Sequence, residues 1–181
     1  LSNHSLIFTN AFANGRQSIE ALPSILASVP SFKVPFTSSP YANQKIQSLV
    51  SVFNEIDYST SFFHGAPNGS MGFLGLSNIL GFDNYYGKNE FNDNSLYDGY
   101  WGIWDEPFLQ FMKIEIEKFK EPFFTTFFSL SSHEPFYVPE KYKDVFPKGN
   151  VQMHEVIGYS DNALKEFFEA SKTQPWFDNT L

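Results

Sequence analysis

The stretch FFTTFFSLSSH, residues 123–133, decides the fold. Bulky apolar side chains stand on both faces of residues 123–130, which is typical of a strand that is covered on both sides in a parallel sheet. The apolar run stops at Ser131, Ser132 and His133. Ligands of open parallel sheets bind beyond the carboxyl ends of the strands, so this polar end is a place to look for function.

Strand and helix patterns alternate along the rest of the chain. A β-branched and aromatic strand is expected over residues 58–63, and it stops at His64. Helices are expected over residues 43–55, 72–80, 106–120 and 151–171, short strands over residues 6–8 and after residue 83, and a long loop over residues 89–100. This alternation predicts an α/β fold with a mostly parallel sheet and helices on both faces.

The composition restricts the class of protein. The 181 residues suit one domain with a sizeable core, and 19% of them are aromatic, including 22 Phe. The net charge of −8 disfavours nucleic-acid binding, because no Lys/Arg cluster is present to contact phosphates. The absence of cysteine excludes disulfides and thiol catalysis. No apolar run reaches the roughly 18 residues that a membrane-spanning helix needs.

Three polar side chains follow expected strands. Ser18, His64 and His133 should lie at one edge of the sheet, because parallel strands end at the same edge. Ser18 also begins an expected helix, whose N–H groups favour an anion. Each residue has a structural alternative. Ser18 is a favoured N-cap residue, and either histidine alone could be purely structural.

Six segments carry a resemblance to a known family. In chain order they are FANGRQSIEALPSILASVP, FFHGAPNGSMGF, GFDNYYG, WGIWDEPFLQF, SLSSHEPFYVPEKY and IGYSDNALKEFF. Together they resemble the lipoteichoic acid (LTA) synthase-like branch of the sulfatase family, within the alkaline phosphatase superfamily. The resemblance covers almost the whole chain. It implies an alkaline phosphatase/sulfatase-like α/β domain on the extracytoplasmic side of a bacterial cell membrane, tethered through segments outside this chain.

The resemblance also implies roles for particular residues. Ser18 matches the nucleophilic hydroxyl, which in the family also ligates a divalent metal ion (manganese, zinc, magnesium or calcium). His64 matches a substrate-side histidine, and His133 matches a second histidine that hydrogen-bonds phosphate oxygens or protonates a leaving group. Asn14 and Arg16 would shape the turn before Ser18 and place a cation near the anionic group. The implied partner is a lipid or glycan phosphoester.

Three departures from the family pattern modify these expectations. The family's other metal ligands, a carboxylate and an Asp-His pair, would fall outside residues 1–181, so we expect a partial domain that retains no metal ion and is inactive by itself. LTA synthases carry Trp and Arg where this chain has Met71 and Phe73, which puts polyglycerol-phosphate synthesis in doubt. Sulfatases use a C/S-x-P-x-R motif, but Ser18 is followed by IEAL, which favours phosphoryl chemistry over sulfate hydrolysis.

Functions of different classes stay open. The favoured one is a metal-dependent phosphoglycerol or phosphoethanolamine transferase, or a phosphoester hydrolase, that acts on envelope lipids or glycans. The alternatives are a sulfuric ester hydrolase and a non-catalytic envelope protein that binds glycan through aromatic side chains in loops. These are Tyr85, Tyr86, Tyr97, Tyr100, Trp101 and Trp104, which could equally form a packed lid. Asp105 matches a recurrent Asp of the family, either as a substrate-binding or as a loop-forming residue.

Overall fold

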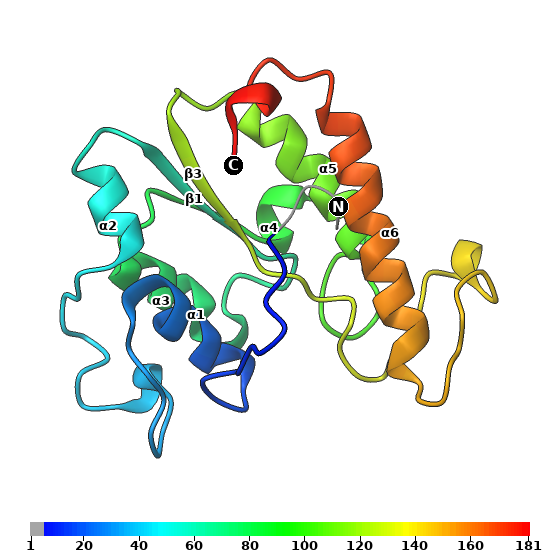
Figure 1. The fold of residues 1–181 in the computed structure, drawn as a ribbon, viewed down its shortest axis with the longest axis horizontal. Helices are drawn as coiled ribbons and strands as arrows, with labels where there is room; N and C mark the ends of the chain where they lie inside the picture. Colours follow the sequence, from blue (N-terminus) through cyan, green and yellow to red (C-terminus); the bar gives the residue numbers. More distant parts are fainter. Residues whose placement is uncertain (1–5) are drawn as a thin grey trace.

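The computed structural model describes residues 6–181, and a three-stranded sheet lies at its centre (Figure 1). The strands are β1 (Ser59–Phe63), β2 (Asn84–Tyr86) and β3 (Phe123–Phe127), in the order β2-β1-β3. The middle strand is parallel to both neighbours, so that Phe63 lies opposite Tyr86 on one side and Phe127 on the other. All three strands therefore end at the same edge of the sheet.

Helices cover both faces of this sheet (Figure 1). One face packs against α1 (Ser18–Ala27), α2 (Leu49–Asn54) and α3 (Phe73–Leu80), and the other against α5 (Asp105–Ile116) and α6 (Met153–Ser171). The short helix α4 (Lys88–Phe91) follows β2. Single 3-10 turns lie at Phe36–Ser38, Ser70–Gly72, Asn94–Leu96, Glu140–Tyr142 and Phe177–Asn179. The predicted α/β fold with a parallel sheet between helices is confirmed.

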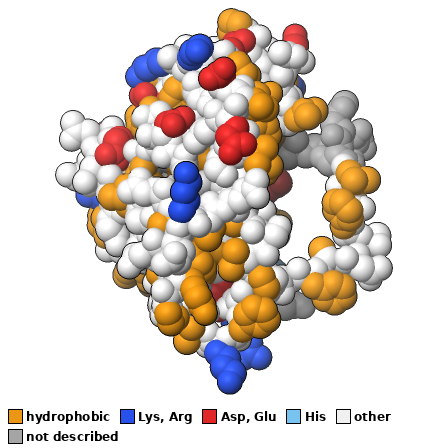
Figure 2. Space-filling model, turned by 90° about the vertical axis from the view of Figure 1, so that its left-hand side faces the viewer, with side chains coloured by type: hydrophobic (Ala, Val, Ile, Leu, Met, Phe, Trp, Pro, Cys, Tyr) orange, Lys and Arg blue, Asp and Glu red, His pale blue; other side chains and the backbone are white. Residues whose placement is uncertain are grey.

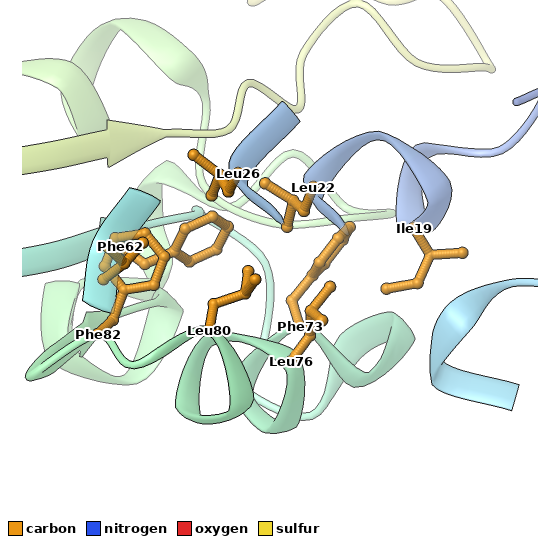
Figure 3. Close-up of a cluster of buried hydrophobic side chains, with 9 residues drawn as sticks. Ile19, Leu22, Leu26, Phe62, Phe73, Leu76, Leu80 and Phe82 are labelled. Atoms are coloured by element: carbon orange, nitrogen blue, oxygen red, sulfur yellow. The ribbon is translucent and has the colours of Figure 1, made fainter. Parts of the chain in front are cut away.

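Alternation along β1 divides the hydrophobic core in two. Phe62 points to the face of α1 and α3, where it belongs to a cluster that contains Leu22 and Phe73 (Figure 3). Phe63 is the next residue, so it points to the opposite face and packs with Phe108 of α5. Both phenylalanines are 0% exposed. The middle strand thus contributes to both halves of the core. The two-sided apolar pattern of β3 predicts the same for that strand.

Residues 6–8 do not form the predicted strand. Leu6, Ile7 and Phe8 are 82%, 65% and 72% exposed, so this segment gains little of the burial that stabilises a strand. Exposed hydrophobic side chains also lie on the side of the molecule that carries α2 (Figure 2), where Val52 and Ile56 are 40% and 58% exposed. No helix within residues 6–181 is long and apolar enough to cross a lipid bilayer.

The helix predicted over residues 43–55 is much shorter in the structure. Only α2 forms, because Ser48 caps it: the Ser48 hydroxyl accepts a hydrogen bond from the Ser51 N–H at 3.0 Å and donates one to the Leu80 carbonyl. The predicted loop over residues 89–100 also differs, since it contains most of α4 and one 3-10 turn. The other predicted helices and strands lie within a few residues of their expected bounds.

Candidate active site

The two candidate histidines lie beyond the same edge of the sheet. His64 follows β1 directly, and His133 is reached from β3 through residues 128–132. Since β1 and β3 are parallel neighbours, both chains leave the sheet on one side. Helix α1 begins at Ser18, and in Figure 3 the arrow of β3 points toward the end of α1 that carries Ile19. The structure thus places two imidazoles beyond the carboxyl edge, as predicted, while the position of the Ser18 hydroxyl relative to them and the chemical roles of all three residues stay predictions.

The start of helix α1 is capped without Ser18. Gln17 is the N-cap residue, the Glu20 side chain bonds back to its N–H, and Ser18 is the first helical residue, so the interpretation of Ser18 as the N-cap is wrong. The Glu20 Oε2 atom accepts hydrogen bonds from the Arg16 N–H at 2.6 Å and the Gln17 N–H at 2.8 Å. The Ser31 hydroxyl donates to the same carboxylate, and these bonds, that of Ser31 first, hold the pKa of Glu20 below its usual range. The half-buried Ser18 hydroxyl takes no part in this cap.

Asn14 and Arg16 lie in the exposed loop that leads into α1. Gly15 between them has a φ of 127°, which residues with a side chain avoid. The Asn14 carbonyl oxygen accepts a long hydrogen bond, 3.4 Å, from the Ser24 hydroxyl of α1. Both residues therefore shape the turn before Ser18. That Arg16 contacts an anionic group stays a prediction.

His64 is buried, and its surroundings define which ring nitrogen carries the hydrogen. Its side chain is 5% exposed, between the edges of the Phe73 and Phe128 rings at centroid distances of 4.9 and 5.5 Å. The Nδ1 atom lies 2.9 Å from the Phe128 carbonyl oxygen. Because a carbonyl only accepts, Nδ1 carries a hydrogen, and Nε2 of the neutral ring is a hydrogen-bond acceptor. Burial lowers the pKa of His64 and so favours the neutral ring. The hydrogen bond to the Phe128 carbonyl acts in the opposite direction but is the smaller effect.

His133 is exposed and lies against an indole. The His133 and Trp101 rings have centroids 4.4 Å apart. The Glu134 carbonyl oxygen accepts from the Trp101 indole N–H and lies 3.0 Å from the His133 Nδ1 atom. A shallow pocket opens here, and Tyr100 and Trp104 also line it. The Nε2 atom of His133 is thus the ring nitrogen that remains for a ligand or a proton transfer.

Asp105 is a buried anchor for the chain that leads to His133. It is 3% exposed, and its carboxylate accepts from the Leu130 N–H at 2.8 Å and the Ser131 N–H at 3.1 Å. In return, the Asp105 N–H donates to the Ser131 hydroxyl at 2.8 Å. Burial raises the pKa of Asp105 to about 6 although the amide hydrogen bonds lower it. This geometry supports the loop-forming alternative for Asp105 rather than direct contact with substrate.

The loop before α5 is fastened to the loop that follows β1. The Asp98 Oδ1 atom accepts from the N–H groups of Tyr100, Trp101 and Gly102 at 2.8, 2.8 and 3.0 Å. The Ile103 N–H then donates to the Gly65 carbonyl at 2.9 Å. Any Cβ atom at Gly102 would collide with the Gly65 carbonyl group. The segments that carry Trp101 and His64 are thus in direct backbone contact.

The aromatic residues expected to form a rim divide into two groups. Tyr85 and Tyr86 belong to β2 and stack on Phe62 and Phe63 at centroid distances of 5.5 and 4.4 Å. The glycan-binding interpretation is therefore wrong for these two residues. Of the other four, Tyr100, Trp101 and Trp104 line the pocket of His133, whereas Tyr97 does not. Tyr97, Tyr100 and Trp101 are exposed, and Trp104 is half-buried. The sequence did not predict the contact between the Trp101 and His133 rings, since no local pattern signals a contact between two loops.

The chain matches one family model over its whole length. The model is that of the sulfatase family, and the match covers residues 1–181. The chain belongs to the sulfatase family. Within residues 6–181, no three His, Asp or Glu side chains lie close enough together to hold a metal ion.

Similar proteins place the chain in the LTA synthase-like branch of this family. It is 22% identical over 151 residues to the lipoteichoic acid synthase-like protein YvgJ of Bacillus subtilis, covering 81% of this chain and 24% of that protein. It is 24% identical over 146 residues to lipoteichoic acid synthase 2 of the same organism, covering 77% of this chain and 22% of that protein. The chain thus spans about a quarter of the length of these relatives.

Solved structures share the fold. An alkaline phosphatase superfamily protein from Vibrio parahaemolyticus superposes with a TM-score of 0.84 at 22% identity, covering 96% of this chain and 43% of that one. The lipoteichoic acid synthase LtaP from Listeria monocytogenes superposes with a TM-score of 0.75 at 22% identity, covering 89% of this chain and 42% of that one. The predicted alkaline phosphatase/sulfatase-like fold is confirmed.

Proposed function

We propose that residues 1–181 are part of a catalytic domain that transfers a phosphate-containing head group between alcohols through Ser18. The observation that carries this proposal is the position of His64 and His133 beyond one edge of a sulfatase-family sheet, together with Ser18 as the first residue of α1. The substrates would be phosphoesters of envelope lipids or glycans, which agrees with the lipoteichoic acid synthases among the relatives. The domain would then act outside the cytoplasmic membrane of a bacterium.

The residues suggest a two-step exchange. In the first step the Ser18 oxygen bonds to phosphorus, and the bond between phosphorus and the departing alcohol breaks. The departing oxygen takes a proton from Nε2 of His133 in its cationic form, an atom open to the pocket, while the Ser18 hydroxyl releases its proton to solvent. In the second step an acceptor hydroxyl, or water, attacks phosphorus and gives its proton to Nε2 of His133. The bond between phosphorus and Ser18 then breaks, and the Ser18 oxygen takes a proton from solvent. The neutral His64 can accept a hydrogen bond from a substrate hydroxyl through Nε2 but cannot donate one there.

The residues that could contact the donor head group differ from those of typical LTA synthases at two positions. Phe73, which occupies the place of a family Arg, is 1% exposed and packs edge-on against His64. Met71, at the place of the family Trp, is 50% exposed and has a φ of 49°. A guanidinium contact to the head group is therefore missing from this position. We infer that Arg16, in the exposed loop before α1, supplies the cationic contact instead.

The family uses a divalent cation beside the nucleophile, and it would raise the nucleophilicity of the Ser18 hydroxyl. The described residues offer Ser18 alone as a ligand of the family type, and they contain no cluster of His, Asp and Glu that fits such an ion. Residues 6–181 therefore do not fit such an ion by themselves.

The test is replacement of Ser18 in the complete gene product. Ser18→Ala should abolish release of glycerol phosphate or ethanolamine phosphate from membrane lipids, because alanine cannot form the phosphoester. Its melting temperature should change little, since the cap of α1 is formed by Glu20 and stays in place. Even the loss of a cap would cost only about 1 kcal/mol. Ser18→Thr is the matched control, because it keeps a hydroxyl and should keep part of the activity. Turnover by Ser18→Ala at the wild-type rate would exclude the covalent route.

A further inference from the structure

A groove runs alongside the candidate active site, and the proposed transfer does not yet use it. Its volume is about 410 Å³. Residues 95–98 form one wall and residues 138–141 form the other, while Trp104, Glu106 and Tyr159 contribute to the lining between them. Asp98 and Trp104 also line the pocket of His133, so the groove and the pocket are neighbours.

The groove contains a carboxylate with one unused oxygen. Glu106 Oε1 pairs with Lys141 Nζ at 2.8 Å, and this pairing raises the pKa of the lysine so that it keeps its charge. Glu106 Oε2 is buried and forms no hydrogen bond of normal geometry with residues in the range 6–181, although the Tyr142 hydroxyl lies near enough for this carboxylate to help raise the pKa of Tyr142, after burial. The Glu106 N–H is already bonded to the Tyr159 hydroxyl at 3.2 Å. A buried acceptor without a donor is unfavourable, so a ligand hydroxyl that donates to Oε2 would remove this penalty.

The rest of the lining is apolar and aromatic. Trp104 stands edge-on against Tyr159 at a centroid distance of 5.7 Å, which fixes its indole, and the Tyr97 ring is 36% exposed. Leu96 and Val138 add aliphatic surface. Rigid aromatic side chains with a few fixed polar groups suit a ligand that has both C–H faces and hydroxyl groups.

The charge of the lining argues against a polyanionic ligand. Three carboxylates, those of Asp98, Glu106 and Glu140, face one ammonium group, that of Lys141. The single cation is already paired with Glu106. A chain of phosphate groups would meet net negative charge along the groove, so the occupant should not be an anion.

We propose that this groove binds a neutral, hydroxyl-rich sugar chain. The sugar rings would pack on Tyr97 and Trp104, with one hydroxyl donating to Glu106 Oε2. The shared residues at the boundary direct the end of such a chain toward His133, so that a terminal hydroxyl becomes the acceptor in the second step of transfer. The acceptor role rests on the proposed function, whereas binding of the sugar does not.

Indole NMR provides a direct test, because the chain contains only three tryptophans. We would titrate maltohexaose, and separately cellotetraose, into the ¹⁵N-labelled 181-residue chain, with Trp101→Phe and Trp104→Phe variants to assign the signals. We expect the Trp104 indole signal to move with increasing sugar. The Trp176 signal should stay in place, because Trp176 is 8% exposed, packs in the core against Phe123 and does not line the groove.

A pair of variants on the same helix identifies the polar contact. Glu106→Ala should weaken sugar binding about tenfold, because it removes the acceptor and releases Lys141. Glu117→Ala is the matched control: Glu117 is paired with Lys113 at 2.9 Å on α5 but lies outside the groove, so binding should not change. Glu106→Gln keeps an acceptor oxygen and should retain more affinity than Glu106→Ala, and an unchanged Trp176 signal shows that each variant is folded.

Three results would overturn the sugar site. The first is a Trp104 signal that neither sugar moves, and the second is equal affinity in Glu106→Ala and Glu117→Ala. The third is a Trp104 shift with glycerol 3-phosphate that is as large as with sugar and declines with added salt, which would indicate a phosphate-binding groove. Ser18→Ala keeps the groove intact and should bind sugar normally. Loss of turnover in that variant therefore tests the transfer reaction separately from sugar binding.

Discussion

Replacing Asp105 with asparagine tests the anchor beneath His133 most directly. The carboxylate accepts one hydrogen bond at each oxygen, from the N–H groups of Leu130 and Ser131. Asparagine supplies one oxygen and one NH₂ group, so one of the two buried N–H groups loses its acceptor and faces another donor. An unsatisfied buried donor costs about 1–3 kcal/mol, so we expect Asp105→Asn to lose about 2 kcal/mol of folding free energy when the wild-type carboxyl is neutral.

The folding free energy that Asp105→Asn loses relative to the wild type should decrease as the pH rises. Burial raises the pKa of Asp105 to about 6 from 3.8, so between these values the folded chain holds a proton that the unfolded chain releases. The contribution of Asp105 to stability is therefore fully present below about pH 4 and is lost as the pH rises through about 6. This loss is about 3 kcal/mol, from 1.36 kcal/mol per pKa unit. Asparagine does not titrate, so the cost of Asp105→Asn should fall from about 2 kcal/mol at pH 4 through zero, and by pH 7 the variant should be about 1 kcal/mol more stable than the wild type.

Urea unfolding of the wild type and of Asp105→Asn, followed by tryptophan fluorescence at several pH values from 4 to 7, measures this difference. Asp161→Asn serves as the matched control, since Asp161 is exposed on α6 and the change removes the same charge. The difference between the two variants isolates the buried site from the change in net charge. A destabilisation by Asp105→Asn that grows from pH 4 to pH 7 would refute the assignment of a desolvated carboxyl.

Three further predictions follow from the site. His133→Ala should lower turnover on the order of 10²- to 10⁴-fold in the phosphate-release assay, and an unchanged rate would remove His133 from proton transfer. Burial lowers the pKa of His64, so the unfolded chain binds the extra proton first; wild-type stability should fall as the pH drops below 6.5, and His64→Gln should lack this decline in urea unfolding. Gly102→Ala should lower the melting temperature because its methyl group meets the Gly65 carbonyl group, whereas Gly75→Ala, with open space around it in α3, should raise or preserve it.

Patterns that depend on near neighbours in the chain were sufficient for most of the fold. The apolar runs at residues 58–63 and 123–130 predict buried parallel strands, and the polar residues that end these runs lie at the predicted edge. The start of α2 could not be predicted, because the Ser48 hydroxyl that caps it is also held by the Leu80 carbonyl, a tertiary contact. The helical spacing of the apolar residues alone extends that helix toward residue 43.

The candidate site was predictable only in its outline. Tyr85 and Tyr86 lie in a strand of three residues, which is too short to show a period of two, so their burial in the sheet was missed. The role of Asp105 depends on amide groups about 25 residues further along the chain. The resemblance to sulfatases identifies such a residue as recurrent, but only the folded chain shows which groups it contacts.

The backbone contact between Gly102 and Gly65 has a consequence for how fast the site can respond to a ligand. The Trp101 segment is held by three hydrogen bonds to Asp98 and is packed onto the chain that follows β1, so its shape is set before any ligand arrives. Binding at a preformed surface loses little conformational entropy and needs no slow loop closure. Association should therefore follow a single exponential whose observed rate rises linearly with ligand concentration, without the plateau that a rate-limiting rearrangement imposes.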